Sequence, residues 1–167
     1  EAYTRNIRLY PVKGDKLSSF PSGRFFSRIR DILTNEFEHG TVKNFLLDPS
    51  YPFSQRELLD ETIRLASELK IDKGGYNGSN WISKLAKATE ECKEDWSHAS
   101  ECLAFFTRFR VYIVGINQAK DASSLRKAVK GFQDEFFIDG TWRSTNRDSD
   151  VNVFQSCMDN LDKLEQK

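Results

Sequence analysis

Apolar side chains recur at three- and four-residue intervals along most of the chain, a spacing typical of amphipathic helices. The first such stretch begins near Pro21, a residue that suits the first turn of a helix. Its apolar register continues to Phe37, and Gly40 is the predicted C-terminal stop. Residues 42–47 follow as a short apolar turn. Residues 1–20 lack this spacing, so we expect an extended or irregular lead-in there.

Two further helices are predicted in the next forty or so residues. Ser54-Gln55-Arg56-Glu57 has the form of a capping box, in which a Ser and a Glu three residues later satisfy backbone groups reciprocally. That helix should stop at Lys73-Gly74, and Ser79 or Asn80 should open the next one after a glycine-rich loop.

The segment from residue 97 to residue 118 admits two interpretations. As a helix it places Cys102 and its aromatic and Ile residues on one broad apolar face. As a strand, residues 108–114 are rich in β-branched and aromatic side chains with partial alternation. Its length and the amphipathic pattern on both sides favour a helix. A strand here would make the fold mixed instead of all-α.

Two helices are predicted to close the chain. Asp121 or Ser123 can cap the first, and Asp148 or Ser149 can cap the second. The whole pattern predicts an all-α fold, a single compact irregular bundle of about five to seven helices. We therefore expect one helical domain over residues 21–167.

Composition narrows the class of protein. The chain has 167 residues, 30% of them charged and 38% hydrophobic, which is too apolar for a disordered tail and too polar for a membrane protein. No run reaches the length of about 18 apolar residues that a transmembrane helix needs. The net charge of zero makes nucleic acid an unlikely partner. We expect a soluble domain with no transmembrane segment.

Phenylalanine is unusually frequent, with 13 residues among the 21 aromatic ones. Core packing is the plain interpretation, and a ligand cavity is the alternative. Two arginines interrupt the most apolar stretch, where they could reach water, pair with a carboxylate, or hold the polar head of an amphiphilic ligand. The predicted ligand-binding residues are Phe105, Phe106, Phe109, Arg108 and Arg110.

The first thirty residues are basic, with seven Lys or Arg against two acidic residues. Aromatic side chains interleave with these charges, and the rest of the chain is net acidic. A basic surface for an acidic protein partner fits this pattern. Arg24, Arg28 and Phe25 are its predicted partner-binding residues.

The three cysteines, Cys92, Cys102 and Cys157, show no metal-ligand spacing, so we predict no metal site and no cofactor. Three buried thiols are the favoured interpretation. A disulfide from Cys157 to Cys92 or Cys102 is the competing one. A catalytic dyad of Cys102 with His98, one helical turn earlier, lacks supporting residues nearby. The compartment stays open, since an odd cysteine count and a first residue other than Met fit several locations.

No constellation of catalytic residues and no family resemblance emerges from this sequence. We therefore expect a non-catalytic protein-interaction module, such as a secreted or pathogen-derived effector or an excised regulatory domain. A helical carrier that binds an apolar or amphiphilic small molecule in a Phe-rich cavity is the alternative. An active site assembled from distant residues would escape this kind of analysis.

Overall fold

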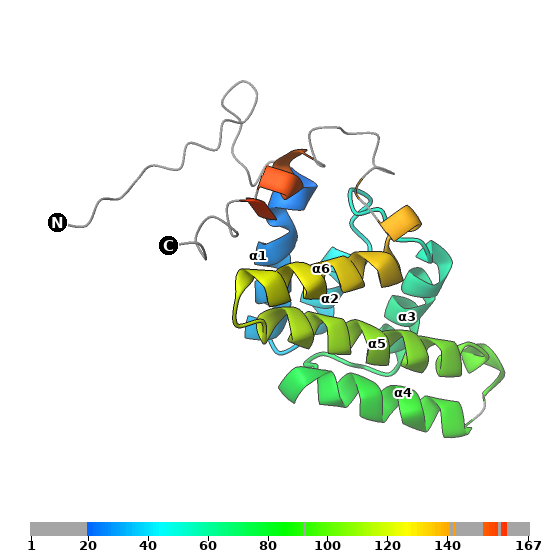
Figure 1. Ribbon diagram of the computed structural model, residues 1–167. Helices are drawn as coiled ribbons and strands as arrows, with labels where there is room; N and C mark the ends of the chain where they lie inside the picture. Colours follow the sequence, from blue (N-terminus) through cyan, green and yellow to red (C-terminus); the bar gives the residue numbers. More distant parts are fainter. Residues whose placement is uncertain (1–19, 92, 141, 143–151, 157, 160–167) are drawn as a thin grey trace.

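The computed structural model describes residues 20–91, 93–140, 142, 152–156, 158 and 159. The described part is helical and confirms the predicted all-α class. Six α-helices are joined by short loops and three 3₁₀ turns, and residues 152–156 and 158–159 are also helical (Figure 1). The α-helices are α1 (Pro21–Thr34), α2 (His39–Leu46), α3 (Arg56–Glu68), α4 (Ser79–Glu91), α5 (Ala99–Asn117) and α6 (Ala122–Phe136). The 3₁₀ turns are η3 (Tyr76–Gly78), η4 (Glu94–Trp96) and η5 (Ile138–Gly140).

Helix α5 occupies the centre of the bundle. It packs against α4 on one side and α6 on the other, and α1 and α3 also contact it (Figure 1). A helix with neighbours on so many sides has little surface left for polar residues, which explains its mixed pattern in the sequence. The prediction of a helix here is confirmed, and the strand interpretation is wrong. Among the described residues the only β pairing is an isolated bridge between Phe53 and Phe137.

Aromatic rings fill the space around α5. Phe106 stacks on Trp81 of α4, with ring centroids 4.5 Å apart and planes 7° from parallel. The Trp81 indole N–H, which is buried, donates to the backbone oxygen of Phe37 at 2.8 Å. On the α6 side, Phe132 lies 5.4 Å from Phe25 of α1. Offset and edge-to-face pairs of this kind add to the free energy gained from burial.

The first helix is shorter than its apolar register predicts. It ends at Thr34, and Gly40 lies inside α2 instead of ending α1, so the predicted stop at Gly40 is wrong. The backbone turns left-handed at Phe37, with φ of 57°, and this turn carries the ring into the core beside Phe106. Gly74 packs against the same turn, because a Cβ there would lie 2.4 Å from the Phe37 oxygen. Tertiary packing therefore overrides the helical register.

One predicted cap is wrong and another is confirmed. Helix α3 begins after Gln55 without a side-chain cap, and Ser54 instead bonds through its backbone N–H and its hydroxyl to the oxygen of Phe136. At α6, Asp121 accepts from the backbone N–H of Ser124 at 2.6 Å, and the Ser124 hydroxyl accepts from the backbone N–H of Asp121. This second pair is a complete capping box.

Two predictions concern residues outside the described part of the chain. The predicted lead-in over residues 1–20 is described only at residue 20, and the predicted capping residues of the last helix, Asp148 and Ser149, are not described. Within the ranges that are described, no helix combines the length and the apolar character needed to cross a bilayer.

Candidate functional site

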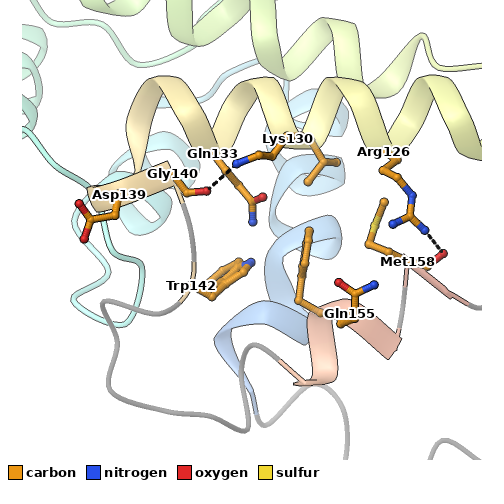
Figure 2. Close-up of a pocket in the computed structure, with 10 residues that line it drawn as sticks. Arg126, Lys130, Gln133, Asp139, Gly140, Trp142, Gln155 and Met158 are labelled. Carbon is orange, nitrogen blue, oxygen red and sulfur yellow. Dashed lines mark hydrogen bonds between the residues drawn. The ribbon is translucent and has the colours of Figure 1, made fainter.

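A pocket of about 490 Å³ lies between α6, η5 and the helical residues 152–156 and 158 (Figure 2). We call it the α6 cleft. It is open to solvent, and its volume is in the range typical of ligand-binding pockets. The described residues that line it are Arg126, Val129, Lys130, Gln133, Asp139, Gly140, Trp142, Phe154, Gln155 and Met158.

One face of α6 forms the upper wall of this cleft. Its lining residues lie at positions 126, 129, 130 and 133, the i, i+3, i+4 and i+7 spacing that puts side chains on one side of a helix. The opposite side of α6 carries Phe132 and Phe136 into the aromatic core. The helix is therefore shared between the core and the cleft.

Gln133 is the buried polar residue of the cleft. Its side chain is 6% exposed and points from α6 into the cleft, toward Trp142 (Figure 2). Its amide is not among the buried polar atoms that lack a hydrogen-bond partner in the described residues. A carboxamide offers one acceptor oxygen and two N–H donors, so Gln133 is a polar group with which a ligand in the cleft could bond.

The two basic residues of the cleft bind its walls. Arg126 donates to the backbone oxygen of Met158 at 3.1 Å, which ties the C-terminal helical residues to α6 (Figure 2). Lys130 donates to the oxygen of Gly140 at 3.2 Å and forms an ion pair with Asp134. These contacts hold η5 and the C-terminal helical residues against α6. The two basic side chains therefore stabilise the walls of the cleft.

The wall opposite α6 combines apolar surface with a second amide. Trp142 and Met158 are nearly fully buried, and Phe154 is half-buried and packs 5.9 Å from the Trp142 ring. Gln155 is exposed and points up into the cleft, while its N–H donates to Asp159 at 2.6 Å (Figure 2). The Gln155 oxygen faces the same space as the Gln133 amide.

The predicted ligand-binding residues lie apart from the α6 cleft. Phe105, Phe106 and Phe109 are at most 1% exposed and pack against other rings of the core. Arg108 pairs with Glu135 of α6 at 2.8 Å between Nε and Oε1, and both side chains are partly exposed. Arg110 is half-buried. Of the three alternatives considered for Arg108, the structure shows the ion pair with a carboxylate. A role of the five residues in binding a ligand stays a prediction.

The predicted partner-binding residues differ in burial, since one lies in the core and the other two are half-buried. Phe25 is 0% exposed and contacts the rings of Phe45 and Trp142, so assigning it to a partner surface is wrong because its side chain is inside the protein. Arg24 and Arg28 of α1 are half-buried. A basic surface made by these two arginines stays a prediction.

Tyr51 lies next to these arginines and is fully buried. Burial and the charge of Asp48 raise the pKa of Tyr51, whereas the charges of Arg24 and Arg28 and a hydrogen bond with Arg28 lower it, and the net value is about 12. Tyr51 is consequently neutral over the whole physiological range of pH.

Cys102 is a buried free thiol, which excludes its disulfide with Cys157 and agrees with the predicted core position. Burial raises its pKa, and a hydrogen bond with Thr62 acts in the opposite direction. His98 does not form the considered dyad with it among the described contacts, because His98 is exposed and bonds to Glu101 whereas the Cys102 thiol is buried. Cys92 and Cys157 lie outside the described residues. Among the described side chains, no group of three or more His, Cys, Asp or Glu could hold a metal ion.

Our sequence reasoning missed the α6 cleft and its central residue. One signal was present: Gln133 lies four residues after Val129 and three before Phe136, so a polar side chain interrupts the apolar stripe of α6. The opposite wall gave no such signal. Trp142 sits in a stretch that the sequence marks as a polar loop, and only folding brings it beside α6.

Comparison with known proteins adds a family assignment. No curated protein and no solved structure matches this chain. One protein family does match, over residues 18–167, and its description is the Treponema TP0900 fourth helical domain. The match covers nearly the whole chain and includes every helix that the structure describes. Its helical character agrees with the bundle observed here. The chain therefore belongs to the family of the Treponema TP0900 fourth helical domain.

Proposed function

We propose that this chain is a non-catalytic protein-interaction module and that a partner docks in the α6 cleft. The observation that carries this proposal is the cleft itself, an open volume of about 490 Å³ lined by the amides of Gln133 and Gln155 and by the half-buried ring of Phe154. A docked partner would bond to the amides and cover the Phe154 ring.

The family description counts the helical domain as the fourth, so in the Treponema protein this unit stands beside other domains. Among the forms of interaction module that the sequence suggests, we favour a regulatory domain for this reason.

The competing function is a carrier for an apolar or amphiphilic small molecule. The aromatic rings around α5 leave the predicted cavity filled, since Phe105, Phe106 and Phe109 contact other rings directly. The α6 cleft is large enough for a small molecule, so the experiment has to distinguish a peptide from such a ligand.

The test is a selection of random peptides displayed on phage against the purified domain. A blocking variant, Gln155→Trp, places a large ring at the exposed rim of the cleft, and Ser156→Trp makes the same change at an exposed neighbour that does not line it. We expect selected peptides to bind the wild type and Ser156→Trp equally. Binding to Gln155→Trp should fall at least about tenfold, because the ring occupies the docking space.

Two results would overturn the proposal. One is a selection that enriches no peptide, or only peptides that bind Gln155→Trp as well as the wild type. The other is a native mass spectrum of the purified domain with excess mass that disappears on denaturation and is absent from Gln155→Trp. That spectrum would assign the cleft to a carried small molecule.

A further inference from the structure

We propose that Arg28, Tyr51 and Arg24 form a binding site for a small oxyanion, a phosphate or a carboxylate group. None of these three residues lines the α6 cleft, so the site is separate from the docking site proposed above. Oxyanion binding here does not depend on a partner in the α6 cleft and goes beyond the proposed function.

Two hydrogen-bond donors at this site are buried without an acceptor. Arg28 and Tyr51 are in contact, and a hydrogen bond between them acts to lower the pKa of Tyr51. A guanidinium has donors alone, so Arg28 cannot accept the hydroxyl proton of Tyr51. The described residues supply no acceptor for that proton or for the Nε–H of Arg28, and both atoms are buried. Such donors cost free energy, which a bound acceptor would recover.

The charge around these donors favours an anion as the acceptor. Arg24 lies one helical turn before Arg28 on α1, and the positive charges of both act on the Tyr51 hydroxyl. The charge of Asp48 also acts on Tyr51, but an Asp48 carboxylate oxygen accepts from the backbone N–H of Ser50 at 2.9 Å and from the Ser50 hydroxyl. A ligand that only accepts and carries negative charge therefore matches the site.

The site lies at the border between the aromatic core and solvent. Tyr51 is 0% exposed, and its ring centroid lies 4.9 Å from that of Phe45 and 5.7 Å from that of Trp142, which fixes the hydroxyl in place. Arg24 and Arg28 are half-buried, so solvent reaches part of each side chain. A small oxyanion can therefore approach along the arginines and reach the hydroxyl by rotation of the Arg28 side chain.

The experiment measures how two anions shift the midpoint of thermal unfolding of the full chain. Sodium phosphate or sodium acetate is added in increasing concentration at about pH 7, and sodium chloride keeps the ionic strength constant so that general screening does not change. The wild type is compared with Arg28→Gln and Arg30→Gln. Arg30 is the matched control, because it lies on the same helix, loses the same charge and is 77% exposed.

We expect one of the anions to raise the midpoint of the wild type and of Arg30→Gln by about 3–6 °C at about ten times its dissociation constant. Arg28→Gln should bind that anion at least about tenfold more weakly, because it loses a charge-assisted hydrogen bond. A larger shift with phosphate would identify a phosphate group as the ligand. A larger shift with acetate would identify a carboxylate, such as an acidic side chain of a partner.

Three results would overturn the site. Equal shifts in Arg28→Gln and the wild type would place the anion elsewhere, and no shift with either anion would leave a buried water as the acceptor. The third concerns Tyr51→Phe, which removes only the hydroxyl and should weaken anion binding about tenfold. Unchanged binding in this variant would overturn the site even if Arg28→Gln fails to fold. Each of these results leaves docking in the α6 cleft to the peptide selection.

Discussion

The two sides of α6 are buried for different reasons. Phe132 is 0% exposed and lies within 4.9 Å of Phe136 and 5.4 Å of Phe25, measured between ring centroids. Gln133, the next residue, is 6% exposed and lines the open α6 cleft. Other rings enclose Phe132, whereas the Gln133 amide borders a space that is open to solvent. Burial alone therefore does not define a core, since the partners of each buried group decide whether it stabilises the protein.

The two sides of α6 also differ in how completely side chains fill them. On the side toward α5 the aromatic rings contact one another directly, so the described residues leave no room for the predicted Phe-lined cavity. The side toward residues 152–156 and 158 contains an open volume of about 490 Å³ with amides on both walls. The α6 cleft therefore offers a ligand the space that the filled side of the helix lacks.

Removing a ring from the filled side should have the largest effect. Phe132→Ala should lower the free energy of unfolding by about 3–5 kcal/mol, because the cavity it leaves is enclosed by rings that cannot collapse into it. Urea denaturation followed by circular dichroism measures this change. A loss below about 1 kcal/mol would contradict the rigid packing described here.

The burial of Tyr51 in the aromatic core can be tested by the dependence of protein stability on pH. Its pKa is about 12 in the folded protein against an ordinary value of 10.0, so between these values the unfolded chain loses this proton while the folded protein keeps it. Stability should therefore fall as pH rises, by about 2 kcal/mol at about pH 12 from this residue alone.

Tyr51→Phe should remove this part of the alkaline loss, because phenylalanine has no proton to release. Tyr76→Phe is the matched control, since Tyr76 is 80% exposed and its change should leave the pH profile as in the wild type. Thermal unfolding recorded from neutral to alkaline pH gives both profiles. Identical profiles for Tyr51→Phe and the wild type would show that Tyr51 is accessible to solvent.

The cleft side of α6 should tolerate loss of its polar group. Gln133→Leu should change the free energy of unfolding by less than about 1 kcal/mol, because the amide borders the open cleft and leucine keeps the apolar contacts of the side chain. The same urea experiment as for Phe132→Ala measures it. A loss of more than about 1 kcal/mol would mean that the amide is already satisfied inside the protein.

The smallest effect is expected at the ion pair between α5 and α6. Arg108→Ala should cost about 0.5 kcal/mol or less, since both partners are partly exposed and water competes for the charges. A double-mutant cycle with Glu135→Ala, measured at low and high salt, isolates the pair. A coupling energy well above 1 kcal/mol that does not change with salt would contradict the prediction, because it would mean that the ion pair is shielded from water.

Local patterns predicted the elements that depend on neighbouring residues. The start of α1 at Pro21, the N-cap at Asp121 and the apolar face of α5 follow from interactions within a few residues along the chain. The same locality explains the errors. Ser54 has the right neighbours for a cap, but its hydroxyl bonds to the oxygen of Phe136, a residue far along the chain. Phe37 continues the register of α1, but packing against Phe106 turns it out of the helix.

By itself the sequence determined that this protein is an all-α bundle with an aromatic core, because helical periodicity and total apolar content are properties of the chain alone. Only the tertiary structure decided which buried residues would find partners. Phe25 became part of the core, Arg108 met Glu135, and Gln133 came to face Trp142 across an open cleft. Those outcomes depend on contacts between segments that are distant in sequence. The periodicity of one helix carries no information about which residues of other segments will pack against it.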